Sequence, residues 1–172
     1  MIELTIEIGL ALERRQIGGT WGGFAWRPLA LFTTPPEVAP WTSLGVGGDV
    51  ARWYAGAFPI RLYSTDTANY RDNLESAAPK LWVVLRPTSP EPPVEVLVIS
   101  ADPAEGEAAT ETGSNVVEII EMPGEIAALV AAFIAEHHVE RPMIKRRRDN
   151  AEPEVRWRDS VARRAGGEEE RS

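Results

Sequence analysis

A strict alternation of side-chain type near the amino terminus, over residues 4–13, constrains the fold more than any other feature of the sequence. Successive side chains of a β-strand point to opposite faces, so a period of two predicts a strand with one buried face. The polar or small positions include Thr5, Glu7, Ala11 and Glu13. The apolar positions, which we expect to form the buried face, are Leu4, Ile6, Ile8, Leu10 and Leu12.

Further strands are predicted downstream, beginning with residues 24–32. Pro28 interrupts the phase of that segment, and a proline cannot donate to a strand ladder, so a bulge or an edge position is expected there. Residues 34–49 are rich in proline and glycine. We expect them to form a long loop, which in a compact domain is often functional. The remaining strand candidates are 52–64, 81–85, 94–99 and 116–120.

A helix is predicted over residues 123–138. Pro123 stands at its first position, where the missing N–H has no cost. Apolar side chains then recur at spacings of three and four residues, and this stripe must cover the sheet. The stripe consists of Ile126, Leu129, Val130, Phe133 and Ile134. A small helix is expected over 67–75, and the acidic stretch 102–114 is interpreted as either a short helix or a loop.

These elements predict an α+β fold. Five or six short, mostly antiparallel strands would form a bent sheet or partial β-barrel, with one long C-terminal helix packed on it. A fully closed barrel is the alternative. The length suits a single domain, which we assign to residues 1–144. Apolar content collapses from Lys145 onward, so residues 145–172 are expected to form a charged, disordered tail.

The charge of the chain is distributed unevenly. The formal net charge is −8, yet residues 1–144 carry 19 acidic and 9 basic side chains, whereas residues 145–172 carry 7 and 9. An acidic body repels phosphate backbones, so nucleic acid is disfavoured as the main partner. The only basic cluster is the run at residues 145–148.

The absence of cysteine excludes several classes of chemistry. Disulfides, thiolate metal sites, iron–sulfur ligation and a cysteine nucleophile all require that residue. Glu3 and Glu7 interrupt the apolar start of the chain, so no signal peptide is predicted. No stretch approaches the roughly 20 apolar residues that span a bilayer. We therefore expect a cytoplasmic protein without a membrane span.

The two histidines do not form a recognisable metal site. His137 and His138 are adjacent, so on a helix they would point about 100° apart, whereas zinc-binding helices place ligands four residues apart. We interpret the pair as a helix C-terminus, whose partial negative charge favours histidine. The glycine-rich segments also lack the spacing of phosphate-binding loops. No catalytic residue, metal or cofactor is predicted.

Tryptophan and arginine supply the candidates for binding. Six tryptophans are many for this length, and both residue types dominate interface hot spots. We favour placing Trp26 in the core and Arg27 on the solvent face, with a recognition site formed by the two as the alternative. The candidates for contact with a partner are Arg27, Trp41, Trp53, His137 and His138, with the basic run as an electrostatic aid.

Several short motifs follow one another in a recognisable order over residues 4–148. They are Glu13-Arg14-Arg15, Trp26-Arg27-Pro28, Tyr70-Arg71-Asp72-Asn73-Leu74, Val83-Val84-Leu85-Arg86-Pro87, Met122-Pro123 and His137-His138-Val139-Glu140. In this order the chain resembles the bacterial family called domain of unknown function 3305. The resemblance carries no catalytic residues. It implies a genetic context, beside genes for molybdenum-dependent formate dehydrogenase and its maturation factors. One departure is that residues 101–114 lack the aromatic side chain expected in relatives, which would weaken a contact made there.

Three functions remain open at this point. We favour a non-enzymatic accessory or assembly protein that binds a protein client, with a formate dehydrogenase component or maturation factor as the partner that the resemblance implies. The second is a domain that binds a small ligand or cofactor, such as one of the molybdopterin type, in a deep pocket lined by tryptophan and arginine. The third is an enzyme with an unrecognised site.

Overall fold

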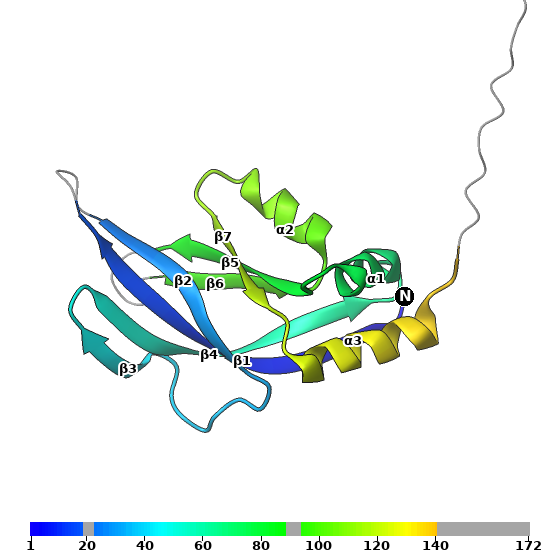
Figure 1. The fold of residues 1–172 in the computed structure, drawn as a ribbon, viewed down its shortest axis with the longest axis horizontal. Coiled ribbons are helices and arrows are strands. Elements are labelled where there is room, and N and C mark those ends of the chain that lie inside the picture. The colour runs from blue at the N-terminus through cyan, green and yellow to red at the C-terminus, as the bar shows by residue number, and fades with distance from the viewer. Residues whose placement is uncertain (19–22, 89–93, 141–172) are drawn as a thin grey trace, which may run out of the picture. The chain divides into compact units, whose positions relative to one another are not determined.

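The alternating segment forms β1 (Glu3–Ile17), an inner strand of the larger of two antiparallel sheets (Figure 1). The computed structural model describes residues 1–18, 23–88 and 94–140. The four-stranded sheet has the order β2-β1-β4-β3 and the three-stranded sheet the order β6-β5-β7. Their other strands are β2 (Gly23–Phe32), β3 (Thr42–Gly47), β4 (Val50–Tyr63), β5 (Lys80–Pro87), β6 (Val94–Ser100) and β7 (Val116–Glu121).

The core includes apolar side chains of both sheets. The even-numbered face of β1 is inaccessible at Ile8, Leu10 and Leu12, and it shares one apolar cluster with Leu81 and Val83 of β5. Burial of this kind is the dominant favourable term in folding. The alternation in the sequence therefore predicted the buried face of β1 correctly over its central part.

Two irregularities change the register of β1 near the middle of the strand. Its pairing with β4 shifts between Leu10 and Ala11, and its pairing with β2 shifts one residue later. Gly56, which lies opposite Leu10, has a φ of 132°, a conformation that favours glycine. Bulges bend a strand and increase its twist, which accounts for a bend in this sheet.

Three helices complete the described part of the chain: α1 (Thr67–Glu75), α2 (Pro103–Thr110) and α3 (Gly124–His137). α1 and α3 lie side by side near the amino terminus (Figure 1). Asn73 of α1 is buried, and its amide donates to the carbonyls of Lys80 and Ala101 while its oxygen accepts from the Lys80 N–H. One side chain thus ties α1 to the start of β5 and the end of β6.

The structure corrects several parts of the predicted fold. There are two sheets rather than one, and the described residues contain no closed barrel. The expectation of one long C-terminal helix is not met, because α3 has 14 residues and is one of three short helices. β3 lies inside the segment 34–49 that we expected to be a loop. A sequence alone does not reveal which strands pair, since pairing depends on tertiary contacts.

Expectations from the sequence also covered the acidic stretch 102–114 and the tail 145–172. The acidic stretch after β6 forms a helix, α2, whose first turn is capped by the Asp102 carboxylate accepting from the Ala104 N–H at 2.8 Å. The proposed tail, residues 145–172, lies outside the described residues. Within the described ranges no helix is long and apolar enough to cross a membrane.

Helix α2 packs so closely on β5 that a glycine is required at the contact. A Cβ atom placed on Gly106 would overlap the ring of Trp82. Overpacking of this kind costs about 1–3 kcal/mol, more than the roughly 1 kcal/mol of helix propensity that alanine gains over glycine. We expect Gly106→Ala to lower the free energy of unfolding by about 1 kcal/mol net, measured by urea denaturation.

Gly113→Ala is the matched control, because a Cβ atom there would meet no atom within 4 Å. We expect it to change stability by less than about 0.5 kcal/mol. Equal stability of the Gly106→Ala variant and the parent protein would show that α2 does not pack on Trp82 as described.

Candidate functional site

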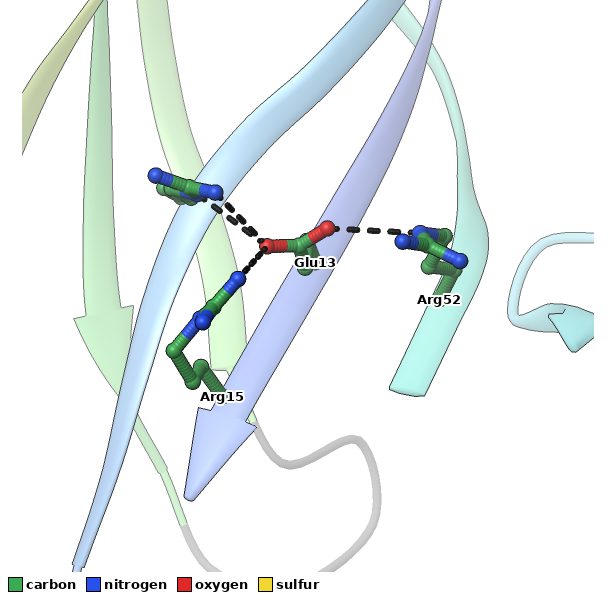
Figure 2. Close-up of polar contacts among 4 residues, drawn as sticks. Glu13, Arg15 and Arg52 are labelled. Carbon is green, nitrogen blue, oxygen red and sulfur yellow. Dashed lines mark hydrogen bonds and ion pairs between the residues drawn. The ribbon is translucent and has the colours of Figure 1, made fainter. Parts of the chain in front are cut away.

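A buried carboxylate with three arginines around it occupies the end of the four-stranded sheet farthest from α1. We call this region the distal end; it comprises residues 13–17 of β1, 23–27 of β2, 41–47 (Trp41 and β3) and 50–53 of β4. Glu13 is 3% exposed, although it lies on the face that the sequence assigns to solvent. The cover comes from side chains on the neighbouring strands and on β1 itself, and Figure 2 shows their arrangement.

Strand register brings this group together. Glu13 lies directly opposite Arg27 of β2 on one side and opposite Arg52 of β4 on the other, so the three side chains share one face of the sheet. Arg15 joins them from β1 because residues two apart on a strand point the same way. We call these four residues the arginine cluster.

The carboxylate oxygens of Glu13 are both occupied. Oε1 accepts hydrogen bonds from Nε and Nη2 of Arg27, at 3.2 and 2.9 Å, and lies 3.6 Å from Nη2 of Arg15. Oε2 accepts from Nε of Arg52 at 3.3 Å. Burial raises the pKa of Glu13, but hydrogen bonds and positive charge from Arg27 and then Arg52 outweigh it and lower the pKa below its ordinary value.

The arginine cluster carries a net charge of +2 on an acidic domain. Arginine stays protonated in proteins, so one carboxylate neutralises only one of the three guanidinium groups. The side chains of Arg15, Arg27 and Arg52 are 57%, 58% and 44% exposed. Their outward N–H groups are therefore accessible to an anionic partner.

The opposite face of the sheet at this end carries three tryptophans, which we call the tryptophan cluster: Trp26 of β2, Trp53 of β4 and Trp41, which directly precedes β3. The distance between ring centroids is 6.1 Å for Trp26 and Trp41 and 5.3 Å for Trp26 and Trp53. Both distances are within the range of favourable aromatic pairs. Trp26 is 9% exposed and belongs to the core, whereas the other two are half-buried at its edge. The expectation for Trp26 and Arg27 is confirmed: the first is in the core and the second on the solvent face.

Arg14 lies on the tryptophan side and contacts aromatic rings. Its guanidinium carbon lies 4.1 Å from the ring centroid of Phe24 and 4.9 Å from that of Trp53. Such cation–π contacts contribute about 0.5–1 kcal/mol at exposed sites. Phe24 is itself half exposed, so the Arg14 side of the distal end presents both charge and apolar area.

Trp41 has an unusual backbone conformation. Its φ is 65°, in the left-handed region that non-glycine residues rarely adopt. The Trp41 N–H donates to the Tyr54 carbonyl at 2.6 Å, and the ring is held against Trp26. Strained residues of this kind cost of order 1–3 kcal/mol and cluster at functional sites.

The histidine pair lies at a different place in the molecule. His138 follows α3 and contacts α1. α1 begins just after Tyr63, the last residue of β4, whereas Trp53 lies near the first residue of that strand. The ten residue-to-residue steps from Trp53 to Tyr63 span about 30 Å at the rise of a β-strand. The structure therefore brings Arg27, Trp41 and Trp53 to the distal end but leaves His137 and His138 apart from them.

Hydrogen bonds fix the tautomer of His138. Its Nε2 lies 3.1 Å from Nη1 of Arg71, and a guanidinium can only donate, so Nε2 accepts. Nδ1 then carries the proton and donates to Oγ1 of Thr67 at 2.9 Å. The His137 ring packs on Phe133, with centroids 4.7 Å apart. Both rings thus serve contacts near the end of α3, and the described residues contain no group of three or more potential metal ligands.

Tyr70, which the sequence places near Asp66 and Asp72, is buried and hydrogen-bonded. Its hydroxyl accepts from the Tyr63 N–H at 3.0 Å, and the side chain is 1% exposed. Burial raises its pKa to about 12. The residue therefore acts as a buried link between α1 and the end of β4.

The sequence interpretation missed Glu13, Arg14, Arg15 and Arg52 as members of a candidate site. A signal was present, because Glu13 and Arg15 follow the alternation of β1 and must share a face. Nothing in the sequence indicated that Arg52 lies beside them, since its position depends on the pairing of β1 with β4, strands 39 residues apart at this point.

Comparison with known proteins places the chain in a family. The model of the family described as "Protein of unknown function (DUF3305)" matches residues 7–148, so the chain belongs to that family. No curated protein and no solved structure matched the chain.

The lowered pKa of Glu13 predicts a pH-dependent contribution to stability. A carboxylate whose pKa is lower in the folded state stabilises the fold above its unfolded-state pKa, and this contribution is lost as pH falls through the folded-state value. We expect Glu13→Gln to destabilise the protein at pH 7, and the difference in Tm from the parent protein to shrink below pH 4.5, the ordinary pKa.

Glu3→Gln is the matched control, because Glu3 lies on the same strand and its carboxylate makes only exposed contacts within the described residues, with Arg61 at 3.6 Å and with the Thr5 hydroxyl at 3.4 Å. We expect the Tm of Glu3→Gln to differ little from that of the parent protein at every pH. A Glu13→Gln difference that stays constant from pH 7 to pH 3 would contradict the account of the arginine cluster.

Proposed function

We propose that this DUF3305 protein is a non-enzymatic accessory protein that binds a protein client through its distal end. The observation that carries the proposal is the arginine cluster: three half-exposed guanidinium groups fixed around one buried carboxylate. A surplus of positive charge at one place on an acidic domain attracts and orients an acidic partner.

Fixation by Glu13 favours binding by the arginines. A free arginine side chain loses about 2 kcal/mol of rotamer entropy when it is ordered. Here the hydrogen bonds of Arg27 and Arg52 to Glu13 supply part of that order in the free protein. Preorganisation of this kind increases affinity because less ordering remains to be done on binding.

Exposed apolar side chains add contact area at the same end of the sheet. Ile17, Phe24, Leu44 and Val46 are all at least about half exposed, and Val46 is 75% exposed. Protein interfaces typically combine an apolar centre with arginine and aromatic residues, and they exclude most other charged side chains from that centre. The distal end has this composition.

We propose a formate dehydrogenase component or a maturation factor as the client. The support is the genetic context implied by the resemblance to the family. The chemistry of the distal end adds one requirement, which is that the client presents carboxylates to the arginine cluster.

A negatively charged planar ligand, such as a cofactor of the molybdopterin type, is the second candidate. Arg14 supports it, because its guanidinium lies against Phe24 and Trp53 and, within the described residues, forms no ion pair. Guanidinium groups beside aromatic rings suit planar anionic ligands.

A pull-down from the host organism tests the client proposal. We expect the tagged protein to recover a formate dehydrogenase component or maturation factor, and the double variant Arg15→Gln/Arg52→Gln to recover about tenfold less, since losing two hot-spot charges costs at least about 1.4 kcal/mol. Arg27 remains to pair with Glu13 in this variant, and a melting curve verifies folding.

The control double variant is Arg61→Gln/Arg86→Gln, which removes the same charge from exposed ion pairs with Glu3 and Glu95 outside the distal end. It should recover as much client as the parent protein. The proposal fails if no such protein is recovered, or if both double variants lose it equally.

A further inference from the structure

β3 is an edge strand within the described part of the chain. It is last in the order β2-β1-β4-β3, so no described strand pairs with its other side (Figure 1). Half of the N–H and C=O groups of an antiparallel strand point away from its partner. Proteins usually shield such edges with charge, proline, a bulge, a very short strand or a covering segment. β3 reads Thr-Ser-Leu-Gly-Val-Gly and has neither a charge nor a proline, although it is short and its pairing with β4 shifts register between Ser43 and Gly45.

On the arginine side, β3 presents bare backbone. Gly45 lies opposite Arg52 and Gly47 lies opposite Val50, so both glycines share the face of the arginine cluster. A Cβ atom on either glycine would meet no atom within 4 Å. A strand added to β3 would lie about 10 Å from β4, two strand spacings away. A long carboxylate side chain on it could reach Arg52 across the glycines.

On the tryptophan side, β3 presents apolar surface. Val46 lies opposite Ala51, and Ser43 lies opposite Trp53. Val46 is the most exposed large apolar side chain of the distal end. An apolar side chain on the opposite face of the added strand would cover Val46. An incoming strand would therefore fit both faces of β3 if its side chains alternated between carboxylate, on the arginine side, and apolar, on the tryptophan side.

We propose that β3 binds an extended segment of the client by strand addition, and that this segment alternates acidic and apolar side chains. The inference rests on the proposed function for the existence of a client and adds the edge, the backbone mode of recognition and the sequence pattern of the bound segment. Backbone hydrogen bonds supply affinity in this mode, and alternate side chains supply specificity.

Charge decides between a client segment and a second copy of this chain. A β3–β3 pair would bring no carboxylate to Arg52, because β3 has none. An acidic segment neutralises the surplus charge of the arginine cluster, which a second β3 does not.

A synthetic peptide tests the proposal on the full-length protein. The probe is an eight-residue peptide of alternating glutamate and valine, and the control has the same composition with the two residues in separate blocks. We expect the alternating peptide to slow amide hydrogen exchange at residues 42–47 and the block peptide to leave it unchanged. Arg52→Gln should weaken binding about fivefold, whereas the matched variant Arg61→Gln on the same strand should not.

A glycine substitution tests the bare backbone directly. Gly47→Glu places a carboxylate of the protein itself beside the arginine cluster, so it should compete with the peptide and weaken its binding by about fivefold or more. Gly113→Glu, at an equally open position of a loop, is the charge-matched control. Melting curves of both variants establish that they are folded.

The results separate this inference from the client proposal. If the peptide binds at β3 but the pull-down recovers no client, the binding site at β3 is supported and the client proposal is overturned. Client recovery that is insensitive to Gly47→Glu, exchange protection at β2 or β6 instead of β3, or equal binding of the block peptide would each overturn strand addition at β3. Protection of residues 42–47 that rises with protein concentration in the absence of peptide would assign the edge to a second copy.

Discussion

The carboxylate of Glu13 is the constraint on which the distal end depends. A buried charge is tolerated only when it is paired and hydrogen-bonded. Both oxygens of Glu13 meet this condition only if β2 and β4 stand in the observed register, with Arg27 and Arg52 directly opposite. A slip of one residue would turn these side chains to the other face of the sheet. The cluster therefore specifies the alignment of three strands as well as presenting charge.

The same strands serve two purposes because their two faces differ. The even-numbered face of β1 continues from the core into the tryptophan cluster, while the odd-numbered face ends in Glu13 and Arg15. Packing of Trp26 against Trp41 and Trp53 holds the face behind the arginines. Rigid support of this kind keeps binding side chains in place without a loop having to order.

Local patterns in the sequence predicted most of the local structure. The alternation over residues 4–13 predicted β1 and the central part of its buried face. The apolar spacing predicted the buried side of α3 at Ile126, Val130 and Phe133, but Leu129 of the same stripe is 45% exposed. The mistaken parts involve long-range pairing. β3 was hidden because glycine weakens the strand signal, although those glycines sit at an exposed edge with room around them. The sequence of an individual strand does not indicate which of the two sheets it joins.

The candidate site follows the same division. Trp26 and Arg27 are neighbours on one strand, so their opposite faces were predictable from the sequence. The convergence of Arg52 with Glu13 was not, because it requires the register of strands far apart in the chain. The adjacent histidines were conspicuous in the sequence for their chemistry, yet His138 bonds Thr67 and Arg71 near the opposite end of β4.

The central claim is that the distal end, and β3 in particular, contacts an acidic client. Photo-crosslinking in the host cell tests it most directly, with a photoreactive amino acid at Val46 and, as the control, at Ile119 of β7, which is also exposed. The account predicts a crosslink from position 46, and none from 119, to a client segment with carboxylates at alternating positions. Crosslinks of equal yield from both positions, or a position-46 crosslink to a segment without carboxylates, would contradict it.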